Sequence, residues 1–106
     1  MKLDTVGEVI ATRELTIVED NSRSTDVVVL LGKPKQLPDF PDYYCPYQIQ
    51  GAGTQEVGYA CGVDAFQALQ LALGTIAVEL EVLNKDLGGR LRWDCDAKGG
   101  LGFPDS

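Results

Sequence analysis

The chain of 106 residues has no histidine, which removes the usual general base near neutral pH and the commonest transition-metal ligand. Catalytic dyads and triads that need an imidazole are therefore excluded. Cysteine is also scarce: Cys45, Cys61 and Cys95 are too few for a four-cysteine zinc site and are an odd number at wide spacing. We expect reduced thiols, no metal, no cofactor, no catalytic residues and hence a protein that is not an enzyme.

Basic residues are few as well. Nine lysines and arginines face sixteen acids, which gives a net charge of −7, and the stretch from Gln36 to Asn84 contains no lysine or arginine at all. Because affinity for nucleic acid comes largely from basic side chains that displace counterions, we expect no direct nucleic-acid binding. A partner of opposite charge would meet a negative field over the middle of the chain.

We expect no membrane span, because the apolar runs do not offer the roughly 20 residues that a span requires. Met1 to Glu8 carry acids before any apolar run, unlike the basic start of a secretory signal. We therefore expect a cytoplasmic protein with no membrane partner. No repeat or linker divides the sequence, and the length suits one domain over residues 1–106.

Four segments have the composition of strands. They are rich in β-branched or aromatic residues and are bounded by turn residues, and they run over Val9–Glu19, Asp26–Gly32, Tyr43–Gln50 and Gln55–Cys61. A turn is expected over Asp20–Ser22, a proline-containing loop over Lys33–Asp42 and a hairpin loop over Gly51–Thr54. Pro46 favours an edge position for its strand, or an amide that points away from the ladder.

A long helix is predicted from Val63 to Lys85. Asp64 and Gln67 form a capping-box pattern at its start, and Gly88 and Gly89 signal its end. Gly74, in the middle of the predicted helix, indicates either that another backbone segment approaches closely there or that the helix simply tolerates a glycine. One stripe with steps of three and four residues should cover the sheet, and its members are Phe66, Leu69, Leu73, Ile76, Ala77, Leu80 and Leu83.

The predicted fold is α+β, with an antiparallel β-meander of about four strands packed against one long C-terminal helix. Arg90–Cys95 is compatible with a short fifth strand that holds Trp93. From about Lys98 onward the glycines and a proline predict a loose tail.

A second apolar stripe on the predicted helix is the main candidate partner interface, formed by Leu71, Thr75, Val78 and Val82 with Glu81 beside it. One interpretation is a surface for a protein partner or for a homodimer. The other is that Trp93, Leu101 or Phe103 folds back and covers the stripe.

Tyrosines suggest a second candidate site, a pocket lined by Tyr43, Tyr47, Tyr59 and Gln48 that would bind a small molecule. Alternatively, the rings stack across paired strands. Cys61 comes just before the helix and is either a reactive thiol or a small buried hydrophobe. A bridge from Cys61 to Cys45 would require a hairpin register that places them opposite each other.

Three segments resemble a group of short, uncharacterised proteins from Gram-negative bacteria: Leu31–Pro34, Tyr43–Ile49 and Gly62–Leu69. The resemblance covers about Val6 to Phe103 and implies no activity or site. From the residues we expect a non-enzymatic, acidic interaction domain, with an immunity-like inhibitor of a basic toxin as a special case. The alternatives are a small-molecule-binding domain and a structural homodimer.

Overall fold

β-branched residues dominate the two long strands near the start of the chain. β1 (Val9–Val18) and β2 (Ser24–Gly32) form an antiparallel hairpin in which Leu15 faces Val27. This computed structural model describes residues 1–19 and 23–104, so the turn expected over 20–22 lies outside the described residues. Both strands confirm their predicted positions, and alternate side chains of each point into the core.

Interior strand β4 (Tyr43–Gln50) has the predicted bounds. Of the two alternatives that Pro46 left open, the edge position is wrong, because β4 has neighbours on both sides. β2 pairs with β4 as far as Tyr47, and β3 (Lys35–Gln36) resumes pairing at Tyr44. Pro46 lies in the gap between these two ladders, where no strand on that side requires its missing amide.

The hairpin after β4 is wider than the sequence indicated. β5 (Gly58–Gly62) starts three residues after the predicted Gln55, so the loop extends from Gly51 to Val57. Gly51, Gly53 and Gln55 have positive φ angles of 103°, 72° and 60°, and this left-handed backbone cannot continue a strand. Residues 51–57 therefore form a loop that is not part of the sheet.

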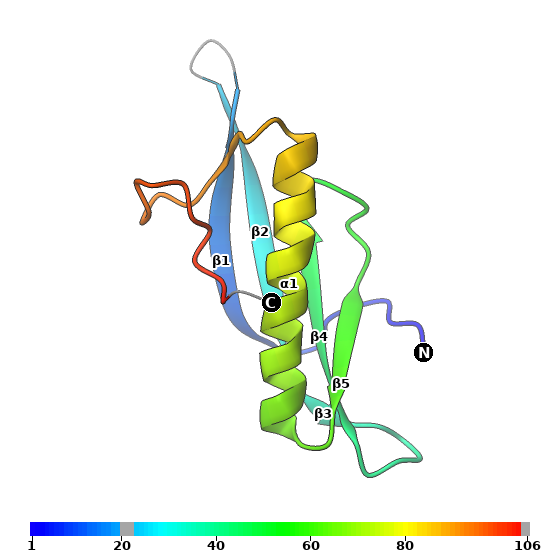
Figure 1. The fold of residues 1–106 in the computed structure, drawn as a ribbon. Coiled ribbons are helices and arrows are strands. Elements are labelled where there is room, and N and C mark those ends of the chain that lie inside the picture. The colour runs from blue at the N-terminus through cyan, green and yellow to red at the C-terminus, as the bar shows by residue number, and fades with distance from the viewer. Residues whose placement is uncertain (20–22, 105–106) are drawn as a thin grey trace.

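The sheet has the order β3-β4-β2-β1-β6, with β5 paired to β4, and every pairing is antiparallel. Helix α1 (Ala65–Asp86) runs along one face of this meander (Figure 1). The α+β prediction is confirmed, and β6 (Leu91–Arg92) is the short fifth strand predicted within Arg90–Cys95. β3 was not predicted; it is two residues long and lies in the expected loop.

The core lies between α1 and the sheet. Helix residues Ala68, Ala72, Ile76 and Leu80 are fully or almost fully buried. Opposite them lie the inward side chains of the strands, which include Leu15, Ile17, Val27, Val29, Leu31, Cys45, Tyr47 and Ile49. No polar or charged residue is buried within the described part of the chain, so packing of apolar surface holds the two layers together.

The predicted inner stripe is wrong at Phe66, whose side chain is 81% exposed. Ala68 is the buried residue of this turn, and a Cβ at Gly62 would overlap its backbone nitrogen, so β5 and the start of α1 are in direct contact. Phe66 is seven residues before Leu73 and shares its side of the helix, but it lies in the first turn, where its side chain is left in solvent.

Both ends of α1 follow the sequence signals. The Asp64 carboxylate accepts a hydrogen bond from the Gln67 amide at 2.8 Å, and the Gln67 side chain accepts one from the Val63 amide at 2.8 Å. Gly88 and Gly89 have positive φ angles just after the C-cap, where their amides bond the last turn.

The segment after α1 folds back over the core. β6 pairs with β1, and Arg13 lies over the rings of Trp93 and Phe103, 4.0 Å and 4.7 Å from their centroids. Arg13 also donates a hydrogen bond to the Leu101 carbonyl at 3.2 Å. Beyond residue 98, Leu101 and Phe103 pack on the core, while Lys98, Gly100 and Gly102 are exposed.

Candidate functional site

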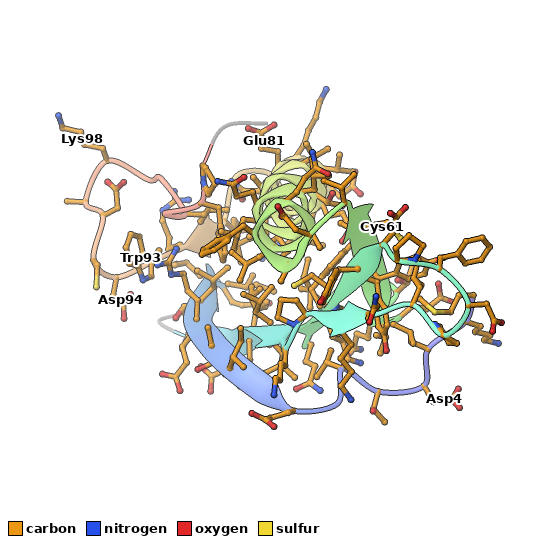
Figure 2. The ribbon with its side chains drawn as sticks, turned by 90° about the horizontal axis from the view of Figure 1, so that it is seen from below. Asp4, Cys61, Glu81, Trp93, Asp94 and Lys98 are labelled. Carbon is orange, nitrogen blue, oxygen red and sulfur yellow. The ribbon has the colours of Figure 1, made fainter. Side chains whose placement is uncertain are left out.

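One face of α1 points away from the sheet and remains uncovered. It holds the predicted interface residues Leu71, Thr75, Val78, Glu81 and Val82, and we call it the outer face of α1. Leu71, Val78 and Val82 are 48%, 41% and 58% exposed, and the Thr75 hydroxyl donates to the Leu71 carbonyl at 2.9 Å. Figure 2 shows Glu81 on the side of the helix opposite the sheet.

The C-terminal segment does not cover the outer face. Leu101 and Phe103 pack on the core and lie beside Ala77, Leu80 and Asn84, on the flank of α1 nearer β1. Of the two interpretations of the second stripe, the structure leaves it open to solvent within the described residues. Such a row of apolar side chains is a typical feature of a surface that another molecule covers.

Gly74 is half-buried and lies beside these residues, near the middle of α1. A Cβ built at this position would have no atom within 4 Å, so no close approach within the chain requires a glycine there. A glycine inside a helix costs about 1 kcal/mol relative to alanine. Folding of the chain alone therefore gives no reason for Gly74.

A cleft borders the outer face where α1 meets the loop between β4 and β5. Its volume is about 420 Å³, and Val78 and Val82 belong both to it and to the outer face. No lysine or arginine lines it. The lining is apolar at Ile49, Ala52, Val57, Val78, Val82 and Leu83, and it carries three carboxylates, at Glu56, Glu79 and Asp86.

Glu79 is held in place by the sheet beneath it. The Tyr47 hydroxyl donates a hydrogen bond to Glu79 Oε1 at 3.0 Å, which leaves Oε2 without a hydrogen bond from the described residues. Burial raises the pKa of Tyr47, and the negative charge of Glu79 and this hydrogen bond raise it further. Gly58 makes room for the tyrosine, since a Cβ there would lie 2.6 Å from its Cζ and hydroxyl oxygen. Tyr47 thus stays a protonated donor that orients Glu79.

Comparison with known proteins adds a family. Residues 11–105 match DUF6968, described as a domain of unknown function. The chain belongs to the DUF6968 family. No curated protein and no solved structure matches it. Family membership covers all of α1 and the cleft, but it assigns no chemistry to either.

The predicted tyrosine pocket is not formed in this DUF6968 domain. Side chains alternate across a strand, so Tyr43 and Tyr47 face α1 while Gln48 faces the opposite side of the sheet. Tyr59 pairs with Pro46 and shares that opposite side, where its ring meets Tyr44 edge-on at 6.4 Å. The stacking alternative describes this pair.

The cysteines of the DUF6968 domain are separated in the same way. Cys45 is buried on the helix side and pairs with Ala60, whereas Cys61 pairs with Tyr44 and is exposed, so the hairpin register does not place them opposite each other. Burial raises the pKa of the Cys45 thiol to about 11, and its Sγ donates to the Gly32 carbonyl at 3.5 Å. The interpretation of Cys61 as a buried hydrophobe is wrong.

Among the described residues, no group of three or more cysteine and acidic side chains is arranged to hold a metal ion. α1 is long and apolar enough to cross a bilayer when judged by length and composition alone, a test that core helices also pass. The sequence interpretation had not expected a stretch of that length. Here α1 packs along the sheet.

Sequence reasoning did not find the cleft. Its two walls, around residues 52–58 and 78–86, are distant in sequence and meet only because β4 and β5 place the loop beside α1. A partial signal was present: Glu79 and Asp86 are seven residues apart, which places them on one side of a helix.

Proposed function

We propose that this DUF6968 domain is a non-enzymatic interaction module that binds a basic protein partner through the outer face of α1. The observation that carries the proposal is the exposure of Leu71, Val78 and Val82 on a helix whose opposite face already fills the core. Apolar side chains that the fold leaves uncovered gain from burial against a second molecule.

Charge supports a basic partner over a second copy of the chain. Within the described residues the ion pair present is Arg90 with Glu19, at 3.8 Å, so the carboxylates around the outer face have no basic side chain in contact. Glu79, Glu81 and Asp86 would face their own copies or one another in a symmetric dimer of this acidic chain. A basic partner would instead associate faster and more specifically.

Gly74 supports a helical or extended segment as the element that docks. Because no side chain projects from its Cα, a partner backbone can come closer to α1 there than at any neighbouring position of the outer face. Leu71 and Val78 then flank the crossing point, one helical turn on either side. Close approach at a small residue increases the dispersion contacts of its neighbours.

We further propose a cytoplasmic setting in a Gram-negative bacterium, with inhibition of a basic toxin as a special case. A small-molecule function at the tyrosines has less support, because their side chains lie on two faces of the sheet. A lipid surface is disfavoured by the same acidic groups that favour a basic protein, since anionic headgroups repel them.

The test replaces Leu71 and Val78 together by lysine. Tagged wild-type and variant proteins are used to capture partners from lysate of the source organism, and a captured basic protein is then purified and titrated by calorimetry. We expect at least a hundredfold loss of affinity in the variant, since a charge would be buried at two central positions. Raised salt should weaken the wild-type complex.

A matched control carries the same charge change elsewhere. Val9→Lys with Phe40→Lys also replaces two exposed apolar residues, neither of which belongs to α1 or lines the cleft, and should bind as the wild type does. Equal loss in both double variants would contradict the proposal. A wild-type dimer in light scattering that Leu71→Lys dissolves, or pelleting with anionic vesicles, would assign the face to another occupant.

A further inference from the structure

The cleft beside the outer face has walls of two kinds. Six of its thirteen lining residues are apolar, three are the acids Glu56, Glu79 and Asp86, and none is a lysine or arginine. An apolar occupant alone would leave the carboxylates facing apolar surface, which is costly. A small anion would be repelled. The occupant that satisfies both kinds of wall has an aliphatic part and a positive end.

We propose that the cleft accepts an arginine side chain of the basic partner. Its methylene groups would lie along Val78, Val82 and Leu83, and its guanidinium group would reach the carboxylates. The planar fork of a guanidinium bonds a carboxylate through two parallel hydrogen bonds, which a lysine cannot do. This inference rests on the proposed function and names the chemistry by which the partner is recognised.

Glu79 is the residue prepared for this contact. Tyr47 fixes Oε1 from below, and Oε2 is available to a donor in the cleft. Tyr47 is almost fully buried and Gly58 leaves space for its ring, so the position of the carboxylate is set before binding. An acceptor oriented in advance loses little freedom on binding, which favours affinity.

Continuity with the outer face places the cleft in the same interface. Val78 and Val82 line both surfaces, so a partner segment that covers Leu71 and Gly74 extends naturally over the cleft. Interfaces commonly have a few anchor residues seated in pockets, and arginine is enriched among them.

The experiment titrates the full-length protein with N-acetylarginine amide and follows amide chemical shifts by NMR. N-acetylcitrulline amide, which has the same shape without the charge, is the ligand control. We expect a dissociation constant on the order of 1 mM for the arginine derivative. The perturbed signals should include Gly53 and Gly58, and the citrulline derivative should give at least a tenfold weaker response.

Protein variants locate the contact. Glu79→Gln with Asp86→Asn removes two charges from the cleft while the glutamine can still accept the Tyr47 hydrogen bond, and we expect at least fivefold weaker arginine binding. Asp39→Asn with Asp42→Asn removes two charges at exposed positions outside α1 and the cleft lining and should bind normally. Equal response to citrulline, unchanged binding in the cleft variant, or shifts confined to other regions would overturn the inference.

The two proposals fail separately. If Leu71→Lys abolishes binding of the protein partner while the Glu79→Gln, Asp86→Asn variant binds it with unchanged affinity, the arginine pocket is wrong and the interaction face stands. If the arginine derivative binds the cleft but Leu71→Lys has no effect on any partner, the interaction face is wrong.

Discussion

The two faces of α1 are both apolar, yet they differ in burial. Ala68 and Ala72 lie on the inner face and let the helix approach the sheet closely, with Ile76 and Leu80 filling the space beyond them. On the outer face the branched side chains of Leu71 and Val78 stand in solvent. The comparison shows that α1 has more apolar surface than the fold buries.

The loop between β4 and β5 borders only part of the outer face. It rises beside the outer face only near Val78 and Val82, where it encloses the cleft, and it leaves Leu71 and Gly74 open. The inner face therefore supports a stable core, and the outer face offers a flat apolar surface that ends in an acidic cleft.

The largest expected effect separates the faces by stability. Ile76→Ala should lower the free energy of unfolding by about 2–5 kcal/mol, because it leaves a cavity at a fully buried position. Val78→Ala, on the outer face, should change it by less than about 0.5 kcal/mol. Urea unfolding followed by circular dichroism measures both. A comparable loss from Val78→Ala would mean that the outer face belongs to the folding core.

The next effect compares two glycines. Gly62→Ala should destabilise the protein by about 1–3 kcal/mol, since its Cβ would overlap the backbone of Ala68. Gly74→Ala should instead stabilise it by about 0.5–1 kcal/mol, because space is open and alanine favours helix. Both are measured by thermal unfolding. If Gly74→Ala also weakens partner binding, its role is at the interface; unchanged binding would remove Gly74 from the proposed contact.

Sequence patterns predicted the elements because each has a local cause. The bounds of β4 follow from its composition and flanking turn residues, and α1 follows from its period and the cap at Asp64. The face of a helix is another matter. Periodicity assigned the correct stripe to the sheet at Ile76, Ala77 and Leu80, but it does not say how far along the helix the core extends, and so Phe66 in the first turn was wrongly assigned to the core.

The sites depended on contacts that spacing cannot supply. The exposed stripe was predicted as a set because its members share one helix. The cleft required the three-dimensional meeting of a loop with α1, and the tyrosine pocket was wrong because strand alternation and the hairpin register place Tyr47 and Tyr59 on opposite faces. The helix and the main strands can be predicted from this sequence, whereas the residues that meet across elements depend on how the helix and the sheet pack together.

The smallest expected effect concerns the inner face at alkaline pH. Burial raises the pKa of the Cys45 thiol to about 11 in the native state, whereas the unfolded thiol has the ordinary pKa of 9.0. This stabilisation is present below pH 9 and is lost as pH rises toward 11, by about 1 kcal/mol at pH 10. Cys45→Ser has no thiol to titrate, so its stability should fall less between pH 8 and pH 10 in urea unfolding, with Cys61→Ser as the exposed control. Equal decline in all three proteins would show that Cys45 does not keep its proton on folding, and would place the inner face of β4 in contact with water.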